Sequence, residues 1–414
     1  MDVVHRNVES WAREVLGVSP VLVIEGARQV GKSTLVSMLG DEDTTYVTMD
    51  DDVVRGFAQR DPVGLLRSGG GRLVIDEIQR CPELILPLKM EVDRDRRPGR
   101  FVLTGSANLL RVPGAEDSLA GRAMTIRLHP FSQGELAGRV DDWVADVVDG
   151  AWSGTRMGGA GRGERADVVD RLVRGGYPPV QGMSDRLRTG WLSDYADRLL
   201  ERDAQDIGGT QVALLRRMVR LIAAAPGAEL VMERMAETLG CSRPTALRHL
   251  EVLESLFLVQ RLPAWSRNLT GRQVQRPRTY LTDTGLVAVL ASLTSEHLQT
   301  AHGSDHLGPV LENFVVSELL RQRSWARHPY DLFHFRDRNG SEVDVVIETP
   351  RGVIGVEVKA ATAARSDHFK HLVKLRDKLG GEFLAGIVLT LGDGQPAGDR
   401  LMAMPVSTLW GSPA

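Results

Sequence analysis

Cysteine is nearly absent from this chain of 414 residues, which contains only Cys81 and Cys241. Two cysteines exclude a disulfide framework and any metal site built only from the cysteines of one chain. The sequence also lacks an apolar signal segment near its start and an apolar run long enough to cross a bilayer. We therefore expect a soluble, cytoplasmic protein without a membrane partner.

Neither sign of charge dominates the sequence. Lysine and arginine number 51, aspartate and glutamate number 54, and the formal net charge is -3. This balance argues against a surface that is basic throughout, although a local basic patch could still bind phosphates. The apolar fraction of 42% is ordinary for a globular protein, and the length predicts more than one domain.

Short apolar runs rich in β-branched residues alternate with stretches of helical spacing in the first third of the chain. This alternation predicts a mainly parallel sheet covered by helices on both faces. The expected strands cover residues 21–24, 46–49, 73–75, 101–103 and 125–128, and one expected helix covers 84–92. The first domain is therefore expected to have an α/β fold.

A glycine-rich loop follows the first expected strand and leads into a helix. Its glycines let backbone amides point at phosphates, while Lys32 reaches the terminal phosphates and Ser33 can ligate magnesium. The pattern predicts binding of ATP with Mg²⁺. The residues expected to contact the nucleotide are Gly26, Ala27, Arg28, Gln29, Val30, Gly31, Lys32, Ser33 and Thr34.

Two further strands end in polar residues that suit the same site. Asp76 would hold the magnesium ion through water, and Glu77 would polarise the attacking water for displacement of the terminal phosphate. Ser106, after the next strand, is the candidate sensor of the γ-phosphate, with a simple turn at Gly105 as the alternative. ATP hydrolysis is thus predicted, with Glu77, Lys32 and Ser106 as catalytic candidates.

Several motifs that follow one another along the chain indicate a protein family more specifically than the phosphate loop alone does. They read Gly-Ala-Arg-Gln-Val-Gly-Lys-Ser, Asp-Glu-Ile-Gln, Leu-Thr-Gly-Ser-Ala and, at 118–122, Ser-Leu-Ala-Gly-Arg. Together with Glu-Arg-Asp at 201–203 and Tyr-Leu-Thr-Asp-Thr-Gly-Leu at 280–286, they resemble a prokaryotic family of AAA-type ATPases with a C-terminal domain of unassigned function. The resemblance implies an ATPase core, a helical and winged-helix middle, and a restriction-endonuclease-like end.

Two arginines are candidates to deliver a positive charge to the γ-phosphate, within the chain or across a subunit interface. They are Arg122, which we count among the nucleotide-binding residues, and Arg202. An ordinary structural role is the alternative for each. The glycine-rich stretch 148–164, which we expect to be a mobile insertion, has no counterpart that we can match to the family.

The middle of the chain has helical spacing and contains a helix-turn-helix pattern. Ser242 is expected to cap the second helix, from which Arg243, Thr245 and Arg248 could face DNA. Packing or protein contact is the alternative for such a module. The stretch 261–278 contains five arginines and no acid, so it could follow a phosphate backbone or form a solvated loop.

Acidic residues and a lysine lie on one predicted hairpin near the C-terminus. Strand periodicity places Glu357 and Lys359 on one face, with Asp344 beside them. The two carboxylates would bind magnesium, and Lys359 would orient or deprotonate an attacking water. The pattern resembles the PD-(D/E)xK restriction-endonuclease-like fold, and that resemblance implies Glu312 as a further acid from the first helix.

The sequence thus predicts an α/β protein of four parts. They are an AAA-type P-loop core (1–135), a helical lid and linker (136–210), a winged helix (211–300) and a nuclease-like α/β domain (301–414). We expect a magnesium-dependent ATPase whose nuclease-like domain acts on DNA or RNA, in a chain that could form homo-oligomers. The alternative is a nucleotide-switched regulatory or interaction protein whose nuclease-like domain is catalytically inactive.

Overall fold

The computed structural model describes residues 4–106, 119–151, 162–203, 211–268, 272, 276–300, 302–337 and 340–411. The chain divides into two compact units: Met1–Pro130 with Ser255–Phe257, and Phe131–Glu254 with Leu258–Ala414. Within the described ranges, no helix is both long enough and apolar enough to cross a membrane.

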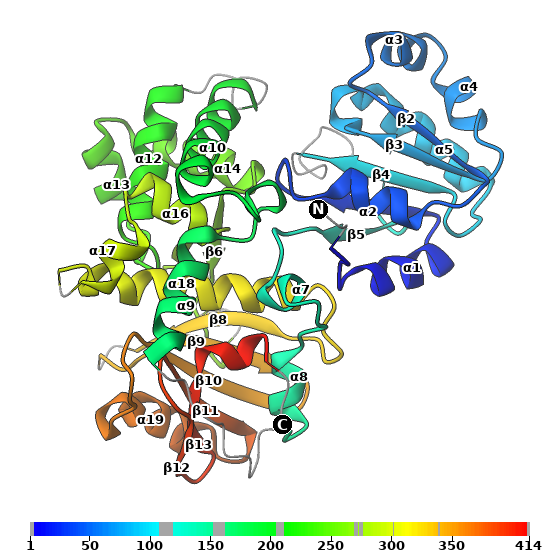
Figure 1. Ribbon diagram of the computed structural model, residues 1–414. Coiled ribbons are helices and arrows are strands. Elements are labelled where there is room, and N and C mark those ends of the chain that lie inside the picture. Colours follow the sequence, from blue (N-terminus) through cyan, green and yellow to red (C-terminus); the bar gives the residue numbers. More distant parts are fainter. Residues whose placement is uncertain are drawn as a thin grey trace. The chain divides into compact units, whose positions relative to one another are not determined.

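The first unit contains a five-stranded sheet in which all neighbouring strands are parallel (Figure 1). The strand order is β2-β3-β4-β1-β5, so β4 lies between β1 and β3. This arrangement confirms the predicted α/β fold. The strands are β1 (Val21–Glu25), β2 (Thr44–Thr48), β3 (Arg72–Asp76), β4 (Phe101–Gly105) and β5 (Ala123–Arg127).

Helices cover this sheet because its central strands are apolar on both faces. Every residue of β1 is buried, as expected for a parallel strand between two helical layers. Side chains of α3 to α5 share one apolar cluster with alternate residues of β1, β3 and β4, while α1 contacts β1. The helices are α1 (Glu9–Val18), α2 (Lys32–Leu39), α3 (Asp52–Arg60), α4 (Pro62–Arg67) and α5 (Ile85–Arg94).

The second unit begins with a mainly helical region. Its helices are α7 (Gln133–Leu136), α8 (Trp143–Val148), α9 (Arg162–Arg174), α10 (Asp185–Arg198), α12 (Val212–Ala224), α13 (Met232–Leu239), α14 (Arg243–Ser255), α16 (Thr284–Leu290) and α17 (Ser295–Gln299). Most of the glycine-rich stretch expected at 148–164 lies outside the described residues, which stop at 151 and resume at 162.

A helix pair and a hairpin follow one another within this region. The turn between α13 and α14 contains Gly240 with φ 70°, a conformation that glycine adopts readily. Ser242 Oγ accepts a hydrogen bond from the Thr245 amide at 3.3 Å, which confirms the predicted cap of α14. Strands β6 (Val259–Leu262) and β7 (Arg278–Leu281) then form a two-stranded antiparallel sheet.

The end of the chain forms a second, six-stranded sheet in the order β12-β13-β11-β10-β9-β8 (Figure 1). The β8-β9-β10 segment is antiparallel, whereas β11 is parallel to both β10 and β13. Its elements are α18 (Ser304–Gln322), β8 (Asp331–Arg336), β9 (Glu342–Thr349), β10 (Gly352–Lys359), α19 (Lys370–Leu379), β11 (Phe383–Thr390), β12 (Gln395–Gly398) and β13 (Leu401–Pro405).

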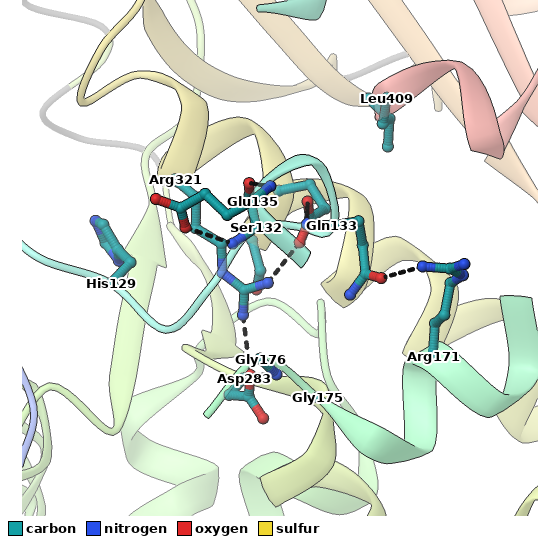
Figure 2. Close-up of polar contacts among 12 residues, drawn as sticks. His129, Ser132, Gln133, Glu135, Arg171, Gly175, Gly176, Asp283, Arg321 and Leu409 are labelled. Carbon is teal, nitrogen blue, oxygen red and sulfur yellow. Dashed lines mark hydrogen bonds and ion pairs between the residues drawn. The ribbon is translucent and has the colours of Figure 1, made fainter. Parts of the chain in front are cut away.

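A buried polar network ties the start of the second unit to α18 (Figure 2). Arg321 lies between Glu318 and Asp283, with 2.9 Å from its Nη2 to Asp283 Oδ2. Asp283 also accepts from the Gly176 amide at 2.7 Å, and Glu318 accepts from the Gln133 amide at 2.8 Å. Buried charges need such complete pairing to be tolerated. The network therefore fixes α18 relative to Asp283, the N-cap of α16, close after β7.

Candidate functional site

The glycine-rich loop leaves the carboxyl end of β1 and enters α2 directly. Gly26 has φ 153°, and a Cβ built on it would lie 2.2 Å from the Leu128 carbonyl oxygen. Gly31 has φ 94° and is the residue immediately before α2. Both positions therefore favour glycine because of their positive φ angles. Gly26 is also required because a Cβ there would collide with the backbone at Leu128.

The Lys32 side chain is buried under this loop. Its ammonium group donates to the carbonyl oxygens of Gly26 and Ala27, each at 2.9 Å. Arg6 supports the loop from another direction, since its guanidinium donates to the Val30 carbonyl at 2.7 Å and to the His129 carbonyl at 2.7 Å. The sequence alone did not identify Arg6, because its partners lie 24 and 123 residues away.

Asp76 and Glu77 lie at the end of β3, beside the end of β4. The Thr104 hydroxyl on β4 donates to Asp76 Oδ1 and accepts from the Glu77 amide at 3.1 Å. Glu77 has φ 54°, in the left-handed region that non-glycine residues rarely adopt. A strained acid held at the carboxyl edge of a sheet is a common feature of functional sites.

Ser106 lies beside Glu77. Its hydroxyl donates to Glu77 Oε2 at 2.8 Å and accepts from Gln79 Nε2 at 3.1 Å. Gln79 contacts the same Glu77 carboxylate. Ser106 therefore contacts the predicted catalytic acid from the neighbouring strand, an arrangement suited to holding that acid in position.

Tyr46 on β2 is a further residue of this edge that sequence reasoning missed. Burial and a hydrogen bond to Asp76 raise the pKa of its phenol, while Ser33 bonds to the same hydroxyl. Ser33 and Asp76, the two predicted magnesium ligands of this unit, thus lie next to one phenol. Their hard oxygen donors and the glycine loop fit a nucleotide that carries magnesium.

Arg122 lies at the opposite edge of the sheet from this loop. It precedes β5, and the register pairs Ala123 with Val21 at the start of β1, about 13 Å from the end of that strand at ~3.3 Å per residue. Its guanidinium binds both carboxylate oxygens of Asp93, at 2.8 and 2.7 Å. This position does not favour contact between Arg122 and the nucleotide of its own chain, and a role for Arg122 at a nucleotide stays a prediction. The side chain of Arg202 lies outside the described residues.

Three of the four C-terminal candidates lie close together in the second unit. The Lys359 ammonium is 2.6 Å from Glu357 Oε2 and 3.5 Å from Asp344 Oδ2. Asp344 Oδ2 also accepts from the Val358 amide at 2.9 Å. Burial raises the pKa of the Glu357 carboxyl, and the nearby Asp344 adds to this effect.

Glu312, the fourth candidate, reaches the cluster through Arg278 rather than directly. Arg278 Nη1 on β7 lies 2.7 Å from Glu312 Oε1 and 3.5 Å from Asp344 Oδ1. The Tyr280 hydroxyl donates to the same Glu312 oxygen at 2.6 Å. Burial raises the pKa of Glu312, again with Asp344 as a second cause.

These carboxylates do not fit a bound metal ion as they stand. In the described part of the chain, no three histidine, cysteine, aspartate or glutamate side chains are grouped so that they could hold a metal. The Arg278 guanidinium lies between Glu312 of α18 and Asp344 of β9. The predicted magnesium ligation by Glu312, Asp344 and Glu357 is thus not supported by this geometry.

The arginines of the 261–278 stretch are largely engaged with acids. Arg272 binds both oxygens of Glu348 at 2.7 Å, and Arg278 joins the cluster described above. Arg261 pairs with Glu254, and Arg267 pairs with Glu382. In the described part of the stretch, four arginines therefore pair with acids, and contact of this stretch with a phosphate backbone stays a prediction.

Comparisons with known proteins identify the first unit. Residues 18–137 match the AAA domain family, and the sheet order and loop agree with that assignment. The first unit therefore has the parallel sheet and phosphate loop typical of an AAA-type P-loop ATPase domain. Residues 165–297 and 307–409 match two domain families of unknown function.

Two uncharacterized mycobacterial proteins are similar to this chain over most of its length. An uncharacterized protein of Mycobacterium tuberculosis is 29% identical over 358 residues, which is 86% of this chain and 74% of that protein. An uncharacterized protein of Mycobacterium bovis matches with the same identity and coverage.

Similarities to solved structures are weak. The RuvB Holliday junction branch migration motor of Thermotoga maritima has 18% identity and a TM-score of 0.28, and the match covers 62% of this chain and 89% of that one. A signal transduction ATPase with numerous domains from Pyrococcus horikoshii has 12% identity and a TM-score of 0.27, with 77% and 45% covered. Scores this low carry no argument about function.

Proposed function

We propose that this protein binds ATP with Mg²⁺ and hydrolyses it. The observation that carries the proposal is the convergence of the Lys32 loop, Asp76 with Glu77, and Ser106 at the carboxyl ends of β1, β3 and β4, which are neighbours in the sheet. Ligands of open parallel sheets bind outside this edge.

Each of these residues has a distinct role in the proposed reaction. The amides of residues 26–34, from Gly26 to Thr34, hold the phosphates, and the Lys32 ammonium exchanges its two carbonyl partners for phosphate oxygens. Glu77 orients and polarises the attacking water, while Ser106 keeps its carboxylate in place. Ser33 and Asp76 would hold Mg²⁺, which when bound neutralises charge on the phosphates.

Measurement of phosphate release tests this proposal. We expect magnesium-dependent release by the wild-type chain and loss of at least about a hundredfold in Glu77→Gln, because a positioned general base contributes 10²–10⁴-fold. Glu42→Gln is the matched control, since it makes the same substitution at an exposed acid of the same unit. Unchanged turnover in Glu77→Gln would remove Glu77 from the mechanism.

For the second unit we propose action on nucleic acid by a winged helix and a nuclease-like domain. Support comes from the α13–α14 pair followed by the β6–β7 hairpin, which is the order of a winged helix. Further support comes from the helix, the antiparallel β8-β9-β10 segment and the Asp344, Glu357 and Lys359 cluster of the C-terminal part. The domain limits 136–210, 211–300 and 301–414 belong to this proposal.

The test is binding and cleavage of labelled DNA and RNA by the full chain, with and without Mg²⁺. Cleavage that disappears in Asp344→Asn supports a nuclease. Binding without cleavage supports the second candidate function, a nucleotide-switched regulatory or interaction protein. The specific observation in favour of that second candidate is the position of Arg278 among the carboxylates. Absence of both binding and cleavage contradicts the nucleic-acid proposal.

We also propose a cytoplasmic location and assembly of the chain into a homo-oligomer. Assembly would allow Arg122, which lies away from its own phosphate loop, to act on the nucleotide of a neighbouring subunit. Sedimentation velocity with and without ATP tests assembly. Monomers under both conditions, at concentrations that support turnover, would contradict it.

A further inference from the structure

The side chain of Arg278 lies inside a cluster of three acids that come from two elements. It contacts Glu312 from α18, Glu342 at the start of β9, and Asp344 two residues further along β9. The Arg278 side chain is only 6% exposed. A charged group so well buried must be paired, and here the three ion-pair partners are carboxylates.

One nitrogen of Arg278 faces the acids of two different elements. Nη1 lies 2.7 Å from Glu312 Oε1 and 3.5 Å from Asp344 Oδ1. A divalent cation shared by a helix acid and a strand acid would have to occupy the space between these same oxygens. The guanidinium therefore fills that space and supplies positive charge there.

Asp344 has both of its oxygens engaged. Oδ1 faces Arg278, whereas Oδ2 accepts from the Val358 amide at 2.9 Å and lies 3.5 Å from the Lys359 ammonium. A metal ion would have to displace one of these partners. Displacement of Arg278 would leave its guanidinium in a buried position without its acids, which is strongly unfavourable.

We propose that Arg278 takes the place of a divalent cation in the C-terminal carboxylate cluster and keeps this site free of metal while β7 is packed on α18. The inference rests on the nuclease-like assignment of that cluster under the proposed function. In this arrangement β7, through the side chain of Arg278, prevents a metal ion from binding to the carboxylate cluster. Cleavage would require β7 to withdraw, and a chain in which β7 stays in place would only bind its partner.

The contacts of β7 explain why Arg278 is held so firmly. Asn313 of α18 bonds to both backbone groups of Leu281, at 3.0 Å to the amide and 2.8 Å to the carbonyl. The ion pair between Arg321 and Asp283 fixes the next residues of the chain to the same helix. Arg278 and the helix acid Glu312 are thus positioned by one shared framework.

Binding of Mn²⁺ to the full chain tests this proposal, with free Mn²⁺ measured by electron paramagnetic resonance. All proteins carry Asp76→Asn, which removes a predicted ligand of the other metal site. We expect no Mn²⁺ binding that depends on Asp344 in this background. Adding Arg278→Gln with Glu342→Gln removes one charge of each sign, and we expect at least about tenfold tighter binding of one Mn²⁺ per chain. Asp344→Asn should abolish that gain.

A matched control and a second variant separate this effect from general damage. Arg272→Gln with Glu348→Gln removes another bidentate pair of the second unit and should give no gain. Arg278→Leu keeps an apolar side chain in the buried position and should give the same gain as the double variant. Asp344-dependent Mn²⁺ binding with Arg278 intact would overturn the proposal, as would absence of binding in folded Arg278 variants.

Nucleic-acid binding is measured in parallel without metal. Its absence in the wild-type chain contradicts the proposed function of the second unit but leaves the Mn²⁺ result unaffected. Conversely, nucleic-acid binding combined with Mn²⁺ binding in the presence of Arg278 overturns only the inference made here. The two failures are therefore distinguishable.

Discussion

Arg278 and Glu312 form a 2.7 Å ion pair between β7 and α18, although 34 residues separate them in the sequence. The pair connects the hairpin that follows the helix pair to the helix that carries Glu312, a predicted metal ligand. Among the described residues of the 261–278 stretch, Arg278 forms ion pairs with the predicted acids Glu312 and Asp344. The interaction makes the C-terminal cluster a charge-compensated site.

Ser106 is predicted to act through Glu77 in the first unit. Ser106→Ala removes a 2.8 Å hydrogen bond to the Glu77 carboxylate, so we expect turnover to fall by about tenfold for a lost bond of roughly 1.5 kcal/mol. ATP affinity should change little. Steady-state kinetics measures the turnover, and a separate binding titration measures the ATP affinity. A loss of ATP affinity without loss of turnover would instead make Ser106 a nucleotide contact.

Arg122 is predicted to be dispensable for nucleotide binding within its own chain. It lies at the amino-terminal edge of β5 and pairs with Asp93, whose pKa falls to about 2 because of the hydrogen bond from Arg122. We expect ATP affinity in Arg122→Ala to stay within about threefold of wild type. A loss of tenfold or more in dilute, monomeric protein would contradict this placement.

Arg321 is predicted to be essential for the stability of the second unit. Arg321→Leu leaves the buried carboxylates of Glu318 and Asp283 without their cation, which costs about 3–5 kcal/mol. Arg323→Gln is the control, because its pair with Asp331 is exposed and worth about 0–1 kcal/mol. Denaturant unfolding compares the two variants, and equal effects would mean that the buried network contributes no more than a surface pair.

The stability of the second unit is predicted to fall between mildly acidic and mildly basic pH. Burial raises the pKa of Asp141 from 3.8 to about 7, with the charge of Glu318 as the second cause. A raised carboxyl pKa means that the folded state binds the proton more tightly, so this stabilisation is full below the ordinary pKa and is lost as the pH rises through about 7. The loss is on the order of a few kcal/mol.

Denaturant unfolding of wild type and Asp141→Asn at pH 5.5 and 8.5 checks this pH dependence. We expect the wild type to lose more stability than the variant over this range, because asparagine does not titrate. Parallel curves for the two proteins would show that Asp141 does not contribute to the change.

Much of the fold could be predicted from local sequence patterns. The central strand β1 is buried on both faces, so its residues 21–24 form an uninterrupted apolar run that a periodicity analysis detects. Ser242 was recognisable as a cap because a hydroxyl before a helical stretch has a defined local function. By contrast, β12 contains proline and glycine and is fully exposed, so its sequence is typical of a turn rather than a strand.

The candidate sites were predictable only where motif and strand end coincide. The sequence shows which strand comes directly before, or ends at, each of Lys32, Asp76 and Glu77. Because the strands are parallel, this places the three residues at the same carboxyl edge of the sheet. The pair of Arg122 with Asp93 could not be predicted, because Asp93 is 29 residues away and nothing local indicates the pair. The role of Arg278 likewise depends on tertiary packing, since its acids belong to α18 and β9.

The most direct test of the central claim is a calorimetric titration of the full chain with ATP in the presence of Mg²⁺. The wild type should bind one ATP per chain. Lys32→Ala should bind at least about tenfold more weakly, because a buried ammonium facing phosphate oxygens is lost. Binding of equal strength by the folded Lys32→Ala protein, or no heat of binding by the wild type, would contradict the assignment of this loop as a nucleotide site.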